Sequence, residues 1–260
     1  MTEPMNQSGT DLTNRIAIVT GAAQGIGARY AQALAKAGAS VVCADVVDSR
    51  ATVAAIKAAG GRALDVRVDV TSPESTRAMA EAAIQTYGRI DILVNNAGLF
   101  TNLALKPFEQ IDSAEWDKVM AVNVRGPFEC SKAVLPAMRA QGYGKIINIA
   151  SGTVFKGAPM LLHYVSSKGA VVAMTRSMAR ELGDAGIRVN TLAPGLTASE
   201  NTMANPAWHG AVSANNIASR AIKREVTPED LCGTLLYLAS PSSDFVTGQV
   251  VVVDGGSVMH

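Results

Sequence analysis

Short runs rich in β-branched residues alternate with alanine-rich stretches along almost the whole chain, and this alternation limits the possible folds. Seven such runs occur, namely RIAIVT (15–20), SVVCAD (40–45), LDVRVDV (64–70), IDILVN (90–95), GKIINIA (144–150), IRVNTLA (187–193) and QVVVVD (249–254). Most are apolar throughout, which is typical of parallel strands that are covered on both faces. The stretches between them, such as IGARYAQALAKAG, have helical periodicity. The pattern predicts an α/β fold with a doubly wound, mainly parallel seven-stranded sheet and helices on both faces.

The alternation runs from about residue 13 to the end without a linker, so we expect residues 1–260 to form a single domain. Glycines close several predicted helices and should adopt left-handed caps there; they are Gly38, Gly60, Gly88 and Gly186. The polar segment at about 196–226 has no strand pattern and is either a surface excursion or a substrate lid. The polar first residues, about 1–12, are expected to be a flexible tail.

Charge and apolar content exclude several classes of function. The chain has 23 Lys and Arg against 22 Asp and Glu, with no basic cluster, so no nucleic-acid partner is expected. It is 48% hydrophobic, yet it has no secretion signal and no apolar stretch long enough for a membrane span, so we expect a cytoplasmic protein without a membrane partner. The three cysteines and three histidines are too scattered for a disulfide framework or a metal site.

A glycine-rich loop follows the first predicted strand and opens a helix. It reads Thr20-Gly21-Ala22-Ala23-Gln24-Gly25-Ile26-Gly27. Glycines allow a tight turn and a close approach of the backbone to a ligand, and the helix N-terminus favours a pyrophosphate. Asp45 ends the second predicted strand, where a Rossmann-type dinucleotide fold places the carboxylate that binds the adenosine ribose. This carboxylate would repel a 2′-phosphate, and neither the loop nor Val46-Val47 supplies a basic residue, so the sequence favours NAD over NADP.

Tyr164 and Lys168 are four residues apart in a predicted helix, so both side chains lie on one face. An ammonium near a phenol stabilises the phenolate and lowers the pKa of the phenol. Such a tyrosine can act as a general base for an alcohol or as a general acid for a carbonyl.

Along essentially its whole length the chain resembles the short-chain dehydrogenase/reductase family. The glycine loop matches the family pattern Thr-Gly-x-x-x-Gly-x-Gly, and Asn95-Asn96-Ala97-Gly98 matches its Asn-Asn-Ala-Gly. Ser151 stands 13 residues before Tyr164, as the family's active-site serine does. Asn123, Pro194-Gly195 and the C-terminal TGQVVVVDGG also match. Ala150, Thr197 and Ser199 are small departures from the family pattern.

The resemblance implies that the chain exchanges a hydride between a nicotinamide cofactor and a carbonyl or alcohol carbon. Tyr164 would move the proton, Ser151 would hold the reacting oxygen, Lys168 would lower the tyrosine pKa, and Asn123 would position a water. The implied substrate residues are Ser151, Thr153 and Tyr164. The implied cofactor-binding residues are Gly21, Gln24, Gly25, Ile26, Gly27, Asp45, Val46, Asp69, Val70, Asn95, Ala97, Gly98, Tyr164, Lys168, Pro194, Gly195 and Thr197.

The residues expected to line the substrate pocket indicate a small secondary alcohol or ketone. These residues are mainly apolar and include no Arg or Lys, which favours an uncharged, hydrophobic substrate, cyclic or aryl; they are Leu99, Phe100, Thr153, Met160, Leu196 and Trp208. A 3-oxoacyl thioester (acyl-carrier-protein) reductase is the alternative enzyme, and a non-catalytic NAD-binding scaffold or another Rossmann-type enzyme fits less well. By analogy with the family we expect a homotetramer that pairs helices around 113–139 and 163–183.

Overall fold

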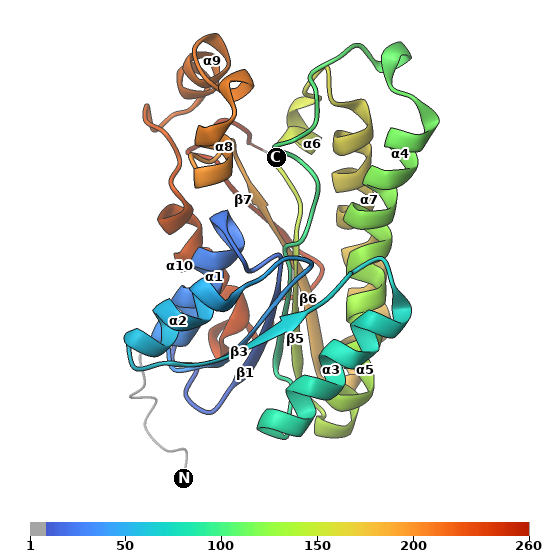
Figure 1. Ribbon diagram of the computed structural model, residues 1–260, viewed down its shortest axis with the longest axis vertical. Coiled ribbons are helices and arrows are strands. Elements are labelled where there is room, and N and C mark those ends of the chain that lie inside the picture. Colours follow the sequence, from blue (N-terminus) through green and yellow to red (C-terminus); the bar gives the residue numbers. More distant parts are fainter. Residues whose placement is uncertain (1–8, 260) are drawn as a thin grey trace.

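The computed structural model describes residues 9–259 and contains a seven-stranded sheet in the order β3-β2-β1-β4-β5-β6-β7 (Figure 1). Every neighbouring pair of strands is parallel. The strands are β1 (Ile16–Thr20), β2 (Ser40–Asp45), β3 (Arg62–Arg67), β4 (Ile92–Asn95), β5 (Gly144–Ile149), β6 (Ile187–Pro194) and β7 (Val250–Val253). The predicted α/β, doubly wound architecture is confirmed.

Helices cover both faces of this sheet. The longer ones are α1 (Gly25–Lys36), α2 (Arg50–Ala58), α3 (Pro73–Tyr87), α4 (Ser113–Met120), α5 (Gly126–Gln141), α7 (Leu162–Leu182), α9 (Ala211–Ser219) and α10 (Pro228–Ala239). Two short helices, α6 (Thr153–Lys156) and α8 (Glu200–Ala204), lie near the carboxyl ends of the strands. In Figure 1, α1, α2 and α10 pack on one face, and α3, α5 and α7 pack on the other. Each layer encloses an apolar core, because the strands direct alternate side chains to opposite faces.

The third strand differs from its predicted position. The sequence pattern places it at 64–70, whereas β3 spans Arg62–Arg67 and its side chains alternate between buried and exposed. As the edge strand of the sheet, β3 is only partly covered, so an apolar run does not mark its limits. Asp69 and Val70 consequently lie in the loop after the strand.

The chain ends and turns agree with the sequence patterns only in part. Gly38, Gly60, Gly88 and Gly186 all have positive φ angles, as predicted for left-handed caps. The prediction of a flexible tail at about 1–12 is wrong at the last of these residues. Leu12 is fully buried, and its N–H donates to the carbonyl of Ala37 at 2.8 Å. Residues 1–8 of that predicted tail lie outside the described residues.

The segment at 196–226 folds over the carboxyl ends of the strands. It contains α8, a short 3-10 turn at Pro206–Trp208, and α9, and it returns through a bridge between Thr197 and Val226. Figure 1 shows α8 and α9 above β6 and β7, facing α6 across a gap. We call residues 196–226 the lid segment. No helix within residues 9–259 is long and apolar enough to cross a membrane.

Candidate active site

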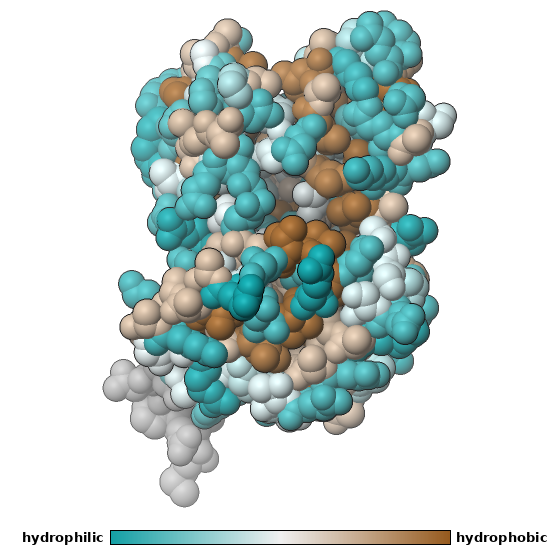
Figure 2. Space-filling view, in the orientation of Figure 1, coloured by the Kyte–Doolittle hydropathy of each residue, from teal (hydrophilic) through white to brown (hydrophobic). Residues whose placement is uncertain are grey.

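A cavity of about 850 Å³ lies at the carboxyl ends of the strands, where the strand order reverses between β1 and β4. Ligands of open α/β sheets bind at this switch point. Figure 2 shows the hollow between the lid segment and the α7 side of the molecule. Most of the predicted site residues line it; they are Gly21, Gln24, Gly25, Ile26, Gly27, Asp45, Val46, Asp69, Val70, Ala97, Gly98, Ser151, Thr153, Tyr164, Lys168, Pro194, Gly195 and Thr197.

The glycine loop has no room for side chains at its closest point. A Cβ atom on Gly27 would lie 2.0 Å from the Gly21 carbonyl oxygen and 2.5 Å from Nδ2 of Asn96. The Asn96 amide holds the loop by donating to the carbonyls of Thr20 (2.9 Å) and Gly21 (3.1 Å). No side chain caps the N-terminus of α1, so its free N–H groups and positive dipole end face the cavity. These features fit the pyrophosphate of a dinucleotide.

Asp45 forms the far end of this part of the cavity. Its carboxylate is only 9% exposed and accepts hydrogen bonds from the N–H groups of Ala23 (2.9 Å) and Val47 (3.1 Å). These bonds fix a negative charge where a dinucleotide would place its adenosine ribose. Asp69 and Val70 line the same end, as predicted.

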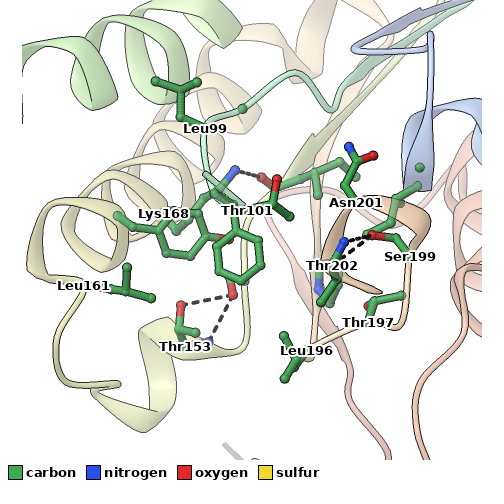
Figure 3. Close-up of a pocket in the computed structure, with 18 of the residues that line it drawn as sticks. Leu99, Thr101, Thr153, Leu161, Lys168, Leu196, Thr197, Ser199, Asn201 and Thr202 are labelled. Carbon is green, nitrogen blue, oxygen red and sulfur yellow. Dashed lines mark hydrogen bonds between the residues drawn. The ribbon is translucent and has the colours of Figure 1, made fainter. Parts of the chain in front are cut away.

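Tyr164 and Ser151 meet at the centre of the cavity. Ser151 Oγ accepts hydrogen bonds from the N–H (3.3 Å) and the hydroxyl (3.0 Å) of Thr153, which fixes its position (Figure 3). Burial raises the pKa of Tyr164 to about 12, against a smaller lowering effect of its hydrogen bond with Ser151. The phenol therefore carries its proton at neutral pH in this structure.

Lys168 does not lower the pKa of Tyr164 here, contrary to the prediction. Its Nζ donates to the carbonyl of Ile149 at 2.8 Å and lies 5.8 Å from the centroid of the Tyr164 ring. Burial lowers the pKa of Lys168 itself to about 8. Desolvation is the largest cause for both groups and favours the neutral form of each.

Asn123 is fully buried in a π-helical turn (Ala121–Arg125) between α4 and α5. Its Oδ1 accepts from the N–H of Leu99 (2.7 Å), and its Nδ2 donates to the Leu99 carbonyl and to Ser167 Oγ, both at 3.1 Å. Asn123 thus does not line the cavity itself but fixes the backbone beside Gly98. A Cβ atom on Gly98 would lie 3.3 Å from Asn123 Oδ1 and 3.5 Å from Lys168 Nζ, so this glycine keeps open the space between them.

Asn95 was predicted to bind the cofactor, but the structure places it behind the cavity wall. Its Nδ2 donates to Ser131 Oγ (3.1 Å) and Asn148 Oδ1 (2.8 Å), which ties β4 to α5 and β5. The next residue, Asn96, lines the cavity instead and was missed. Side chains alternate along a strand, so the last buried residue of β4 points inward and its successor points to the ligand edge.

The substrate end of the cavity has an aromatic wall. Phe100 stacks on Tyr164 and Trp208, with ring centroids 4.8 Å and 4.5 Å apart. The lid segment, to which Trp208 belongs, also lines the cavity with polar residues, but these face the glycine loop: a Cβ atom on Gly25 would lie 3.7 Å from Nδ2 of Asn201 and 3.9 Å from Cβ of Ser199 (Figure 3). All six residues predicted to line the pocket do so, but the predicted absence of basic residues is wrong, because Lys156 lines it too. Its position in α6, one turn past Thr153, is the signal that could have identified it.

Three comparisons with known proteins extend this description. A family model described as enoyl-(acyl carrier protein) reductase matches residues 21–258. A short-chain reductase, NovJ of Streptomyces niveus, is 40% identical over 247 residues and covers 93% of each chain. Galactitol 2-dehydrogenase of Agrobacterium fabrum is 39% identical over 258 residues, 95% of this chain and 99% of that protein.

A solved structure gives the same result for the fold. The crystal structure of a putative NAD(P)-dependent gluconate 5-dehydrogenase of Beutenbergia cavernae, with NADP bound at low occupancy, superposes with a TM-score of 0.89. It is 37% identical in sequence, and the match covers 96% of this chain and 99% of that one. With the glycine loop, the Ser151–Tyr164–Lys168 cluster and these full-length matches, the chain belongs to the short-chain dehydrogenase/reductase family of oxidoreductases.

Proposed function

We propose that this protein is an NAD-dependent oxidoreductase that interconverts a secondary alcohol and a ketone. The observation that carries the proposal is that Ser151, Tyr164 and Lys168 line the same cavity as the glycine loop and Asp45. When bound there, the nicotinamide cofactor supplies or accepts the hydride. The glycine loop would hold its pyrophosphate, and Asp45 its adenosine ribose.

The side chains at the centre of the cavity would manage the proton of the reaction. Ser151 would donate a hydrogen bond to the substrate oxygen, because its own Oγ is held by Thr153. Tyr164, protonated at neutral pH, would donate its proton to a carbonyl oxygen during reduction and become a phenolate. In the oxidation direction that phenolate would accept the hydroxyl proton of the alcohol. Lys168 would be the nearest cation to the phenolate formed in reduction, and Asn123 would keep the Gly98–Leu99 backbone in place beside it.

Two features of the cavity support the finer parts of the proposal. Asp45 disfavours a 2′-phosphate, and no Arg or Lys among the described cavity residues lies at that end to offset it, which favours NAD over NADP. Phe100 and Trp208 offer an aromatic wall of two tilted rings, which favours a substrate with a cyclic or aryl part. Galactitol and gluconate are named for similar proteins, and they are not proposed as substrates of this chain.

A 3-oxoacyl thioester (acyl-carrier-protein) reductase is the second candidate; the description of the matching family model, an enoyl-(acyl carrier protein) reductase, shares the carrier protein with it but names a different reaction. The Asp45 carboxylate weakens it, because biosynthetic reductions generally use NADP. A non-catalytic NAD-binding scaffold would need neither Ser151 nor Tyr164 in the cavity.

The replacement Tyr164→Phe tests the proposed chemistry. It removes the proton donor and keeps the ring stacked on Phe100, so kcat should fall by at least ~10²–10⁴-fold while the affinity for NADH, measured by its fluorescence, stays within about twofold. The matched control is Tyr237→Phe on an exposed part of α10, which should keep the wild-type rate. A Tyr164→Phe enzyme with wild-type kcat would falsify the assignment.

A further inference from the structure

Lys156 places a positive charge one helical turn away from the reacting centre. The helix α6 starts two residues after Ser151, and Thr153 in its first turn donates to Ser151 Oγ. Lys156 is three residues after Thr153, so the two side chains lie on the same face, with their Cβ atoms roughly 5–6 Å apart. Both residues line the cavity. Along the cavity wall, Ser151, Thr153 and Lys156 therefore follow one another with increasing distance from the proton donor Tyr164.

The ammonium of Lys156 forms no salt bridge with the described residues. Its Nζ donates to the neutral hydroxyl of Ser219 at 3.2 Å, and none of the salt bridges found within residues 9–259 includes it. An ammonium can donate three hydrogen bonds, so donors remain for a ligand. Ser219 belongs to α9, whose Asn215 and Asn216 line the same part of the cavity. These three polar residues and Lys156 form what we call the acid subsite.

Two other charged residues act on Lys156: Asp254 attracts the ammonium and Arg220 repels it. Arg220 is buried outside the cavity lining and is bound to backbone carbonyls, including that of Leu196 at 2.8 Å. Asp254 lines the cavity and accepts through Oδ1 from the N–H groups of Gly256 and Ser257, both at 3.0 Å. The Lys156 ammonium is thus held by a neutral hydroxyl, while Oδ1 of the nearby carboxylate is bound to the backbone.

We propose that the acid subsite binds a carboxylate of the substrate, at the end opposite the carbonyl or alcohol that reacts at Tyr164. This inference rests on the proposed function and specifies its substrate class as an oxo acid and the corresponding hydroxy acid. The apolar middle of the substrate lies against Phe100 and Trp208, while its carboxylate lies between α6 and α9. A single ammonium with neutral hydroxyl and amide donors suits a monoanion, whereas phosphate groups are commonly held by the fork of an arginine or by several cations.

The first test measures binding without turnover. Isothermal titration calorimetry, with and without added NAD, compares cyclohexanecarboxylate with cyclohexanecarboxamide. We expect the wild-type protein to bind the carboxylate at least about tenfold more tightly than the amide, and Lys156→Gln to remove that difference while leaving amide binding unchanged. Lys156→Arg should restore part of the preference. The control Lys223→Gln removes a lid lysine that does not line the cavity and should change nothing.

Several results would overturn the acid subsite. They are equal binding of the two probes by the wild type, no saturable binding of the carboxylate, or a carboxylate preference that survives in Lys156→Gln. If Lys156→Gln loses binding of the carboxylate and the amide alike, the result also contradicts the subsite, because Lys156 then supports the shape of the pocket and does not select the carboxylate.

The second test uses turnover to separate this inference from the proposed function. With NADH, Lys156→Gln should raise KM for 4-oxocyclohexanecarboxylate at least about tenfold, with kcat and the KM for its ethyl ester nearly unchanged. If the wild type reduces the ester and the acid equally well, the subsite is wrong and the proposed function stands. If carboxylate binding depends on Lys156 but no ketone is reduced, the proposed function is wrong and the subsite stands.

Discussion

Asp45 shows how a single side chain can decide which cofactor a cavity of this kind accepts. Its carboxylate is held by two backbone N–H groups, so it cannot turn away from an incoming 2′-phosphate. Replacing it by alanine removes the repulsion, and we expect the ratio of kcat/KM for NADP to kcat/KM for NAD to rise at least about tenfold. Steady-state kinetics with both cofactors measure that ratio.

The control for this prediction is Asp48→Ala, which removes an exposed carboxylate three residues further on that pairs with Arg50. It should leave the ratio near its wild-type value. An unchanged ratio in Asp45→Ala, or an equal change in both variants, would contradict the assigned role of Asp45.

Sequence patterns identified individual residues well where spacing alone fixes their position. Tyr164 and Lys168 follow from helical geometry, and the glycines follow from the strand-to-helix turn. Asn96 and Lys156 were missed because their roles depend on which way a side chain points at the end of a strand or around a single helical turn. The direction of the Tyr164 pKa was wrong because burial, which the sequence does not reveal, dominates it.

At the scale of elements, the π-helical turn between α4 and α5 positions the substrate wall. Asn123 in this turn binds both the N–H and the carbonyl of Leu99. Asn123→Ala leaves these groups without their partners, so we expect a loss of about 1–3 kcal/mol in the free energy of unfolding. The displaced Gly98–Phe100 wall should also lower kcat about 10–100-fold. Urea unfolding and steady-state kinetics measure the two effects.

Ser167→Ala is the matched control for Asn123, because it leaves both bonds to Leu99. It removes the third partner of the amide and the hydrogen bond from Ser167 Oγ to the Tyr164 carbonyl. Its effect on kcat should be small. If Asn123→Ala loses stability but keeps the wild-type kcat, the turn has only a structural role.

Most helices and strands could be predicted, but their limits and interruptions could not. Six of the seven strands follow from apolar runs, the edge strand β7 among them. The other edge strand, β3, was shifted, because its polar and apolar residues alternate and so no apolar run marks its limits. The π-helical turn at Ala121–Arg125 has no sequence signature. It packs against α7, and such a contact between distant segments cannot be read from the local sequence. The helices of the lid segment lack an apolar face strong enough to predict them.

For the molecule as a whole, the buried charge at the active site affects the stability of the fold. Burial lowers the pKa of Lys168 from its ordinary value near 10.5 to about 8. Between these two values the unfolded chain binds more protons than the folded one, so the contribution of Lys168 to stability rises with pH from about 8 to 10.5. Tyr164 acts in the opposite direction, but only above pH 10, since its pKa is raised from 10.0.

Lys168→Met removes this dependence. From pH 7 to 9.5, we expect the wild type to gain about 1–2 kcal/mol in unfolding free energy relative to Lys168→Met, measured by urea denaturation at each pH. Lys36→Met, at an exposed position in the last turn of α1, should follow the wild type. A constant difference between wild type and Lys168→Met over this range would show that Lys168 does not titrate there.

A parallel, doubly wound sheet with a glycine loop after its first strand follows from general rules for α/β proteins, and the sequence therefore predicted it. Contacts between distant parts of the chain could not be predicted from the sequence. Lys156 and Ser219 are 63 residues apart and meet only because α6 and α9 face each other across the cavity. The acid subsite that we propose depends on this contact, so local sequence patterns could not indicate it.

The central claim is that this cavity carries out hydride transfer with Tyr164 as the proton donor. The most direct test incubates the protein with 4-deuterated NADH and a panel of neutral and acidic cyclic ketones, and locates deuterium in the alcohols by mass spectrometry and NMR. We predict one deuterium at the carbinol carbon of the product with the wild type, and at least ~10²-fold slower labelling with Tyr164→Phe. The absence of labelled alcohol with every ketone, or labelling by Tyr164→Phe at the wild-type rate, would contradict the claim.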